Sequence, residues 1–131
     1  MKKNNMQPIL QLMRTTFGLL SLITGMDAFL NLLANWGLYI SPFVRSILPF
    51  SGDLFMIIVG FVEILIGIFF FSQFTILAAY FFSAWLILIS FNLVLAGFYD
   101  IAVLDVVLSI SVFCYAQLVK LGSKEFLMRG A

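Results

Sequence analysis

Four long apolar stretches constrain this chain more than any other feature. A helix needs about 20 apolar residues to cross a hydrocarbon core of about 30 Å. Stretches of this kind run over about residues 9–34, 54–71, 74–95 and 101–121. Runs such as Phe69-Phe70-Phe71 do not alternate apolar and polar residues, as the strands of a membrane barrel do. The sequence therefore predicts an all-α integral membrane four-helix bundle, with residues 1–131 as a single membrane domain.

Composition supports a membrane location and excludes several function classes. Hydrophobic residues make up 63% of the 131 residues and charged residues 10%, against about 25% charged in soluble domains. So short a chain cannot bury all this apolar surface in one core, so we expect membrane lipid to cover the rest. The net charge of +1 gives no reason to expect a nucleic-acid partner. The chain has no histidine and one cysteine, Cys114, so we expect no metal and no covalently bound cofactor.

The connections between the spans differ in character. Only Ser72 and Gln73 separate the second and third spans, which predicts a tight antiparallel hairpin. The first connection is longer, and its residues 36–50 are rich in aromatic and aliphatic side chains. Ser41 followed by Pro42 is typical of a helix N-cap and first turn. We therefore predict a short interfacial helix between the first and second transmembrane helices, the alternative being a loop that plugs the bundle.

The placement of basic residues predicts the orientation. Arg45 lies in the first connection, and the other six basic residues lie toward the two ends of the chain: Lys2, Lys3, Arg14, Lys120, Lys124 and Arg129. Four spans put both ends on the same side, and basic residues favour the cytoplasmic side. We therefore expect both termini in the cytoplasm and the chain in a plasma membrane, the inner membrane of a bacterium.

Glu63 is the most unusual residue, because it lies in the middle of the second span. A charged side chain at the centre of a bilayer costs about 2.5–3.5 kcal/mol even on the lenient insertion scale. Gly60 and Gly67 lie on the same helix face as Glu63, and small residues allow a neighbouring helix to approach closely. This face is therefore predicted to point inward. Glu63 either handles protons or binds a ligand, or it only forms a hydrogen bond between helices.

The first span carries a matching stripe of Arg14, Gly18, Ser21 and Gly25. Gly18 and Gly25 are predicted to be helix-packing positions, like the two glycines of the second span. Side chains lean toward the N-terminus of their own helix, so Arg14 and Glu63 lean away from each other. We therefore interpret Arg14 as an anchor at the cytoplasmic interface; a direct pair with Glu63 is the less favoured alternative.

Three further polar residues lie near the outer ends of the predicted spans. Asp27 and Asn92 each lie about 27 Å along spans that begin inside, and Asp105 lies about 6 Å below the outer face. We predict that Asp27, Glu63, Asn92 and Asp105 form a polar cavity for a ligand or for protons, with the first connection as its lid. The alternatives are that the two aspartates are ordinary interface residues and that Asn92 only links helices. No catalytic residue is assigned.

These residues, in this order, resemble the DoxX and DoxX-like membrane proteins over about residues 14–118. The matching elements are Arg14, Gly18, Gly25 and Asp27 in the first span, the Gly60-x-x-Glu63-x-x-x-Gly67 element, and Asp105 near the head of the fourth span. The resemblance implies a four-helix bundle that serves as a membrane subunit of a sulfur or quinone oxidoreductase, or as an accessory protein in membrane redox complexes. Relatives often carry a basic residue directly before the fourth-helix aspartate. Leu104 stands there in this chain, which argues against a charge-paired site.

Three functions follow, in order of preference. The first is a non-enzymatic accessory subunit, or a protein that binds a small lipophile such as a quinone, associated with lipid and with a protein partner or a second copy. The second is a membrane subunit of a quinone-linked oxidoreductase in which Glu63 donates a proton. The third is a small proton-coupled exporter; its dual-insertion type needs a weak charge bias, whereas this chain has a strong one.

Overall fold

The computed structural model describes the backbone of residues 3–130 and the side chains of residues 6–123. Helices form nearly all of it, and this part of the chain contains no strand: α1 Lys3–Leu30, the 3-10 helix η1 Trp36–Tyr39, α2 Pro42–Ile47, α3 Gly52–Phe70, α4 Thr75–Ala96 and α5 Tyr99–Gly130. Four segments are long and apolar enough to cross a membrane: Met6–Leu30, Gly52–Phe70, Thr75–Ala96 and Tyr99–Ser123. The predicted all-α bundle, with four helices long and apolar enough to span a membrane, is confirmed.

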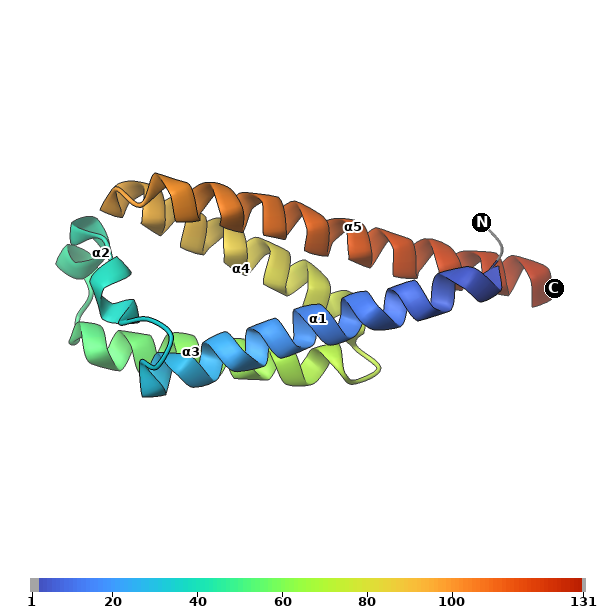
Figure 1. Ribbon diagram of the computed structural model, residues 1–131, viewed down its shortest axis with the longest axis horizontal. Helices are drawn as coiled ribbons and strands as arrows, with labels where there is room; N and C mark the ends of the chain where they lie inside the picture. The colour runs from blue at the N-terminus through green and yellow to red at the C-terminus, as the bar shows by residue number, and fades with distance from the viewer. Residues whose placement is uncertain (1–2, 131) are drawn as a thin grey trace.

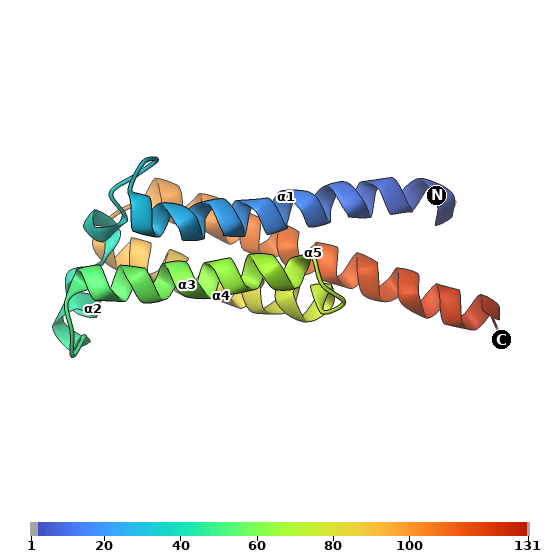
Figure 2. The same cartoon turned by 90° about the horizontal axis from the view of Figure 1, so that it is seen from below.

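The four long helices pack as two pairs. α1 lies along α3, and α4 lies along α5, with far less contact between the pairs. The pairs meet near the α3–α4 turn and diverge toward α2 (Figure 1), and Figure 2 shows α1 and α3 in front of α4 and α5. The start of α1 and the end of α5 lie at the opposite end of the bundle from α2 (Figure 1). The divergence leaves space between the pairs at the α2 end.

Glycines let the backbones of α1 and α3 approach each other. A Cβ atom added to Gly60 would lie 2.7 Å from the Gly25 carbonyl oxygen, and one added to Gly25 would lie 2.8 Å from the Gly60 carbonyl oxygen. A Cβ at Gly67 would lie 2.6 Å from the Leu22 side chain, and one at Gly18 would lie 2.5 Å from the Phe71 ring. These four glycines therefore form the α1–α3 contact.

Serines join α4 to α5 in a similar way. Ser83 Oγ donates to the Ser109 carbonyl oxygen at 2.9 Å, and Ser109 Oγ donates to the Ser83 carbonyl oxygen at 2.7 Å. Nearer α2, Ser90 Oγ donates to the Ala102 carbonyl oxygen at 2.9 Å. Each hydroxyl is satisfied by the backbone of the neighbouring helix, as is common between membrane helices. The serine stripes thus hold the second pair together and are not free to bind a ligand.

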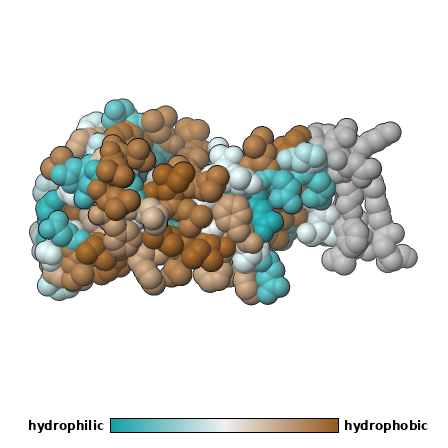
Figure 3. All heavy atoms as spheres, turned by 60° about the horizontal axis from the view of Figure 1, so that its bottom comes forward, coloured by the Kyte–Doolittle hydropathy of each residue, from teal (hydrophilic) through white to brown (hydrophobic). Residues whose placement is uncertain are grey.

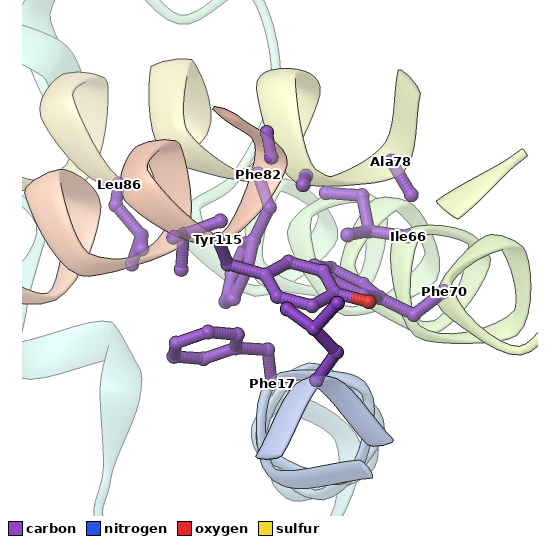
Figure 4. Close-up of a cluster of buried hydrophobic side chains, with 11 residues drawn as sticks. Phe17, Ile66, Phe70, Ala78, Phe82, Leu86 and Tyr115 are labelled. Atoms are coloured by element: carbon purple, nitrogen blue, oxygen red, sulfur yellow. The ribbon is translucent and has the colours of Figure 1, made fainter. Parts of the chain in front are cut away.

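An aromatic cluster closes the bundle where the two pairs meet. Phe17 of α1, Phe70 of α3, Phe82 of α4 and Tyr115 of α5 converge there (Figure 4). The Phe70 and Phe82 rings pack edge to face at 5.9 Å between centroids. Toward the outside the helices present large apolar side chains, for example Leu77 and Leu88, which are 67% and 63% exposed. Figure 3 shows these hydrophobic residues as a broad brown area over the bundle.

Two predicted boundaries differ from the structure. The first helix ends at Leu30, not at residue 34, because Asn31 adopts a left-handed φ of 51° and Asp27 accepts hydrogen bonds from the next backbone N–H groups. The fourth helix begins at Tyr99 and continues beyond residue 121. Its link to α4 is shorter than predicted, because Gly97, with a φ of 88°, ends α4 and the Phe98 N–H donates to the Leu93 carbonyl oxygen.

A short helix does lie between the first two spans. Ser41 Oγ accepts a hydrogen bond from the Val44 N–H at 3.1 Å, and Pro42 is the first residue of α2. The helix covers residues 42–47, and the one-turn helix η1 precedes it, so together they occupy most of the predicted segment 36–50. The position of this segment at a membrane interface stays a prediction.

Candidate functional site

A cavity of about 410 Å³ fills the space between the diverging helix pairs. The aromatic cluster closes one end through Phe82, and the segment from Trp36 to Val44 covers the other. The lining is largely apolar and comes from all four long helices as well as that segment: Leu20, Thr24, Ala28, Trp36, Tyr39, Ile40, Val44, Phe55, Met56, Val59, Glu63, Phe82, Trp85, Leu86, Leu88, Ile89, Asn92, Leu93, Ile101, Asp105 and Leu108. None of these residues is basic.

Glu63 lines the cavity from α3 and is only 8% exposed. Its Oε1 atom accepts a hydrogen bond from Trp85 Nε1 of α4 at 3.3 Å. On the α1 side, Ser21 Oγ donates to the Glu63 backbone carbonyl oxygen at 2.6 Å. Gly60 packs the same stretch of α3 against α1. The close α1–α3 contact therefore fixes the helix, while the carboxyl group reaches across to the other pair.

Asp105 and Asn92 line the same cavity from α5 and α4. Within the described residues no group donates a hydrogen bond to the half-buried Asp105 carboxyl. Asn92, in contrast, has partners for both its oxygen and its nitrogen. Its Oδ1 accepts from the Ser41 N–H at 2.9 Å, and its Nδ2 donates to the Tyr39 carbonyl oxygen at 2.8 Å. Asn92 thus fastens the covering segment onto α4.

The structure does not bring Asp27 into the cavity. This side chain is 4% exposed and turns toward the loop after α1. Its oxygens accept hydrogen bonds from three successive backbone N–H groups, those of Leu32, Leu33 and Ala34, and from Trp36 Nε1 at 2.6 Å. A carboxylate with this many donors is a loop anchor. The predicted group of four polar residues is therefore a group of three.

Arg14 of α1 lies beside the C-terminal end of α3, away from Glu63. Its Nε donates to the Phe70 carbonyl oxygen at 2.6 Å, and a terminal nitrogen donates to the Ser72 carbonyl oxygen at 3.3 Å. The guanidinium carbon lies 6.0 Å from the centre of the Phe71 ring. A cation that binds the last carbonyl groups of a helix is favoured by the helix dipole. Arg14 therefore caps α3 and forms no pair with Glu63.

The aromatic walls of the cavity were not predicted. Both tryptophans of the chain, Trp36 and Trp85, line it, together with Tyr39, Phe55 and Phe82. One signal in the sequence points to Trp85. The tight hairpin after Phe71 places residues on either side of it at matching heights, and α4 therefore passes Glu63 at about residues 82–85. Helix packing brought Trp85 to the carboxyl group.

Comparison of the chain with protein-family models, with curated proteins and with solved structures gave no match. Leu104, which precedes Asp105, is 67% exposed on the outer side of α5. A basic residue at position 104 would point away from the cavity, so the leucine there does not change the charge of the cavity wall.

Proposed function

We propose that this integral membrane protein binds a small lipophilic molecule in the cavity beside Glu63 and acts as an accessory component without catalysis of its own. The observation that carries the proposal is a largely apolar cavity of about 410 Å³ with a buried carboxyl group in its wall, formed between membrane-spanning helices. Ligand sites in proteins commonly have about 300–1,000 Å³ and combine apolar walls with few polar groups.

The alternative, a carboxyl group that only joins helices, explains less of the site. A purely structural hydrogen bond in a membrane bundle is expected within close packing, as between Ser83 and Ser109. The Trp85–Glu63 bond instead spans a gap that neighbouring side chains leave open. An unfilled gap forfeits dispersion contacts, so its presence favours an occupant.

The lipid phase is the proposed source of the guest. The lining includes Leu88, which is 63% exposed on α4, so the cavity continues to the apolar outer surface. The segment that covers the cavity exposes Leu38, Phe43 and Ile47 at 68%, 56% and 64%. Such side chains suit the membrane–water boundary. We propose that η1 and α2 lie in that boundary and close the outer end of the cavity.

Orientation is proposed from the basic residues. Arg45 is on α2, whereas Arg14 and Lys120 lie toward the opposite end of the bundle, where α1 begins and α5 ends. Basic residues favour the cytoplasmic side, so both termini are placed in the cytoplasm of a cell whose plasma membrane holds the protein. A fluorescent protein fused to the C-terminus should fluoresce, and alkaline phosphatase fused there should stay inactive. The reverse pattern would contradict this orientation.

A link to membrane redox processes is proposed from the resemblance to DoxX-like proteins. The Gly60-x-x-Glu63-x-x-x-Gly67 element supports it, since its two glycines face α1 while its glutamate lines the cavity. A quinone is then one candidate guest, and a redox enzyme or a second copy of the chain is a candidate partner.

Native mass spectrometry of protein extracted in mild detergent tests for an occupant. Val59 lines the cavity, so Val59→Phe should fill part of it and reduce the bound mass seen with the wild type. Val103→Phe is the matched control, because Val103 is 61% exposed on the outer side of α5. The control should retain the bound mass. An equal bound mass in Val59→Phe, or none in the wild type, would contradict the proposal.

A further inference from the structure

The hydrogen-bond donors in the cavity wall are nearly all committed to protein acceptors. Trp85 and Trp36 each have one indole N–H, and each gives it to a carboxylate. The Asn92 amide and the Thr24 hydroxyl donate to backbone carbonyl groups. Among the side chains that line the cavity, this leaves the Tyr39 hydroxyl and the second N–H of the Asn92 amide without a partner in the described residues. A guest that only accepts hydrogen bonds therefore finds few donors.

The acceptors show the opposite balance. The Asp105 carboxyl has no donor in the described part of the chain, and Glu63 accepts one hydrogen bond, from Trp85, with the Thr24 hydroxyl also beside it. The lining holds two acidic residues and no basic one. A carboxylate in apolar surroundings is costly unless a positive charge or several donors accompany it. The wall therefore lacks a cation and has few free donors. A protonated amine supplies both a charge and donors, and a quaternary ammonium group supplies the charge.

The aromatic side chains favour the same kind of guest. Trp36, Tyr39 and Trp85 line the same cavity as the two carboxyl groups, and Trp85 contacts Glu63 directly. Indole and phenol rings attract a cation over their faces, and the attraction grows when water is excluded. The remaining apolar wall suits a hydrocarbon body. Charge, donor balance and aromatic content thus agree.

We infer that the guest is a lipophilic amine or quaternary ammonium compound, with its positive head beside Glu63 and Asp105 and its apolar body among the aromatic residues. The inference rests on the proposed function, since it names the chemical class that the cavity takes. The ammonium group belongs either to a free lipophilic amine or to the headgroup of an aminolipid. A quinone, which offers only acceptors, supplies neither a positive charge nor a donor to the two carboxyl groups.

Two isosteric probes separate charge from shape. Benzyltrimethylammonium and neopentylbenzene differ only in a quaternary nitrogen in place of a quaternary carbon. Their binding is measured by equilibrium dialysis against the full chain in phosphatidylglycerol nanodiscs, with empty nanodiscs as the blank. Glu63→Gln keeps the volume and an acceptor for Trp85, so the variant retains the fold contacts. It should weaken binding of the cation about tenfold or more and leave binding of the neutral probe unchanged.

Asp105→Asn should also weaken binding of the cation. The control Asp100→Asn should change the binding of neither probe, because Asp100 is exposed and outside the lining. If the neutral probe binds as tightly as the cation and Glu63→Gln changes neither affinity, the inference is overturned, although the proposed function is supported. If neither probe nor a short-chain quinone binds above the blank, the proposed function itself fails.

A second arm identifies the source of the ammonium group. Part of the phosphatidylglycerol is replaced with phosphatidylethanolamine, and the dialysis is repeated with the cationic probe. A weaker apparent affinity shows that the aminolipid headgroup competes for the site, and an unchanged affinity assigns the site to a free amine. Both results support an ammonium guest.

Discussion

Trp85 Nε1 donates a hydrogen bond to Glu63 Oε1 at 3.3 Å and thereby joins the two helix pairs across the cavity. Among the described side chains it is the only hydrogen bond that runs directly from a helix of the α1–α3 pair to a helix of the α4–α5 pair. The pairs otherwise meet through the aromatic cluster near the α3–α4 turn. The buried glutamate is thus both part of the cavity wall and part of the link that holds the cavity open.

The energy of this link is expected to be modest. Interhelical hydrogen bonds in membrane proteins contribute about 0.6 kcal/mol on average and up to about 1.7 kcal/mol in double-mutant cycles. A cycle of Trp85→Phe and Glu63→Leu, with the free energy of unfolding measured in detergent, should give a coupling in that range. A coupling of zero would show that the hydrogen bond contributes nothing to the fold.

Gly60 should tolerate no side chain. A Cβ atom there would lie 2.7 Å from the Gly25 carbonyl oxygen, a backbone atom that can move only with its helix. We expect Gly60→Ala to lower the free energy of unfolding by about 1–3 kcal/mol, as overpacking does. Gly122→Ala is the matched control within a helix, because the nearest atom to its Cβ lies 3.5 Å away. The control should be neutral or stabilising, and equal losses in both variants would contradict the proposed α1–α3 contact.

Asp27 is predicted to stabilise the loop after α1 without a part in ligand binding. Asp27→Ala removes the acceptor of three backbone N–H groups and of the Trp36 indole N–H. We therefore expect the free energy of unfolding to fall by about 1–3 kcal/mol. Hydrogen exchange at Leu32, Leu33 and Ala34 should become faster. The exposed Asp53 offers the control Asp53→Ala. Exchange rates that are unchanged in Asp27→Ala would be inconsistent with the anchor.

Asn92 is predicted to hold the cover of the cavity in place. Asn92→Leu has a similar size but leaves the Ser41 N–H and the Tyr39 carbonyl group without their partner. Hydrogen exchange should therefore rise over residues 39–44 while exchange in the core of α4 stays unchanged. Asn92→Asp should have a smaller effect at Ser41, because an acceptor is kept. Equal protection of the segment in the wild type and in Asn92→Leu would count against this role.

The fold could be predicted because its signals are local. The four apolar stretches give the spans, and the glycines at Gly18, Gly25, Gly60 and Gly67 mark a close helix contact. The end of α1 could not be placed from hydrophobicity, since residues 31–34 are largely apolar. The end of α1 depends on the Asp27 side chain, which turns back to bind the loop. An aspartate near the end of a span does not by itself predict this contact.

The site was predictable only in part, for a geometric reason. Position along the spans placed Glu63, Asn92 and Asp105 at compatible heights, and all three line the cavity. Height alone does not show which way a side chain turns, so Asp27 was placed with them although it faces the loop. Ser83, Ser90 and Ser109 are polar residues within α4 and α5, but each bonds the backbone of the neighbouring helix. The aromatic walls arise from the divergence of the helix pairs, which no short motif encodes.

Fluorescence of Trp85 tests whether a lipophile enters the cavity beside Glu63. Trp36→Phe leaves Trp85 as the single tryptophan in the chain, and a brominated lipophile quenches indole fluorescence only in contact. Titration in nanodiscs should give saturable quenching that the unbrominated compound reverses and that Val59→Phe weakens. Quenching that rises in proportion to the probe in the lipid, with the same slope in Val59→Phe, would show that Trp85 meets only bulk lipid and would contradict the account.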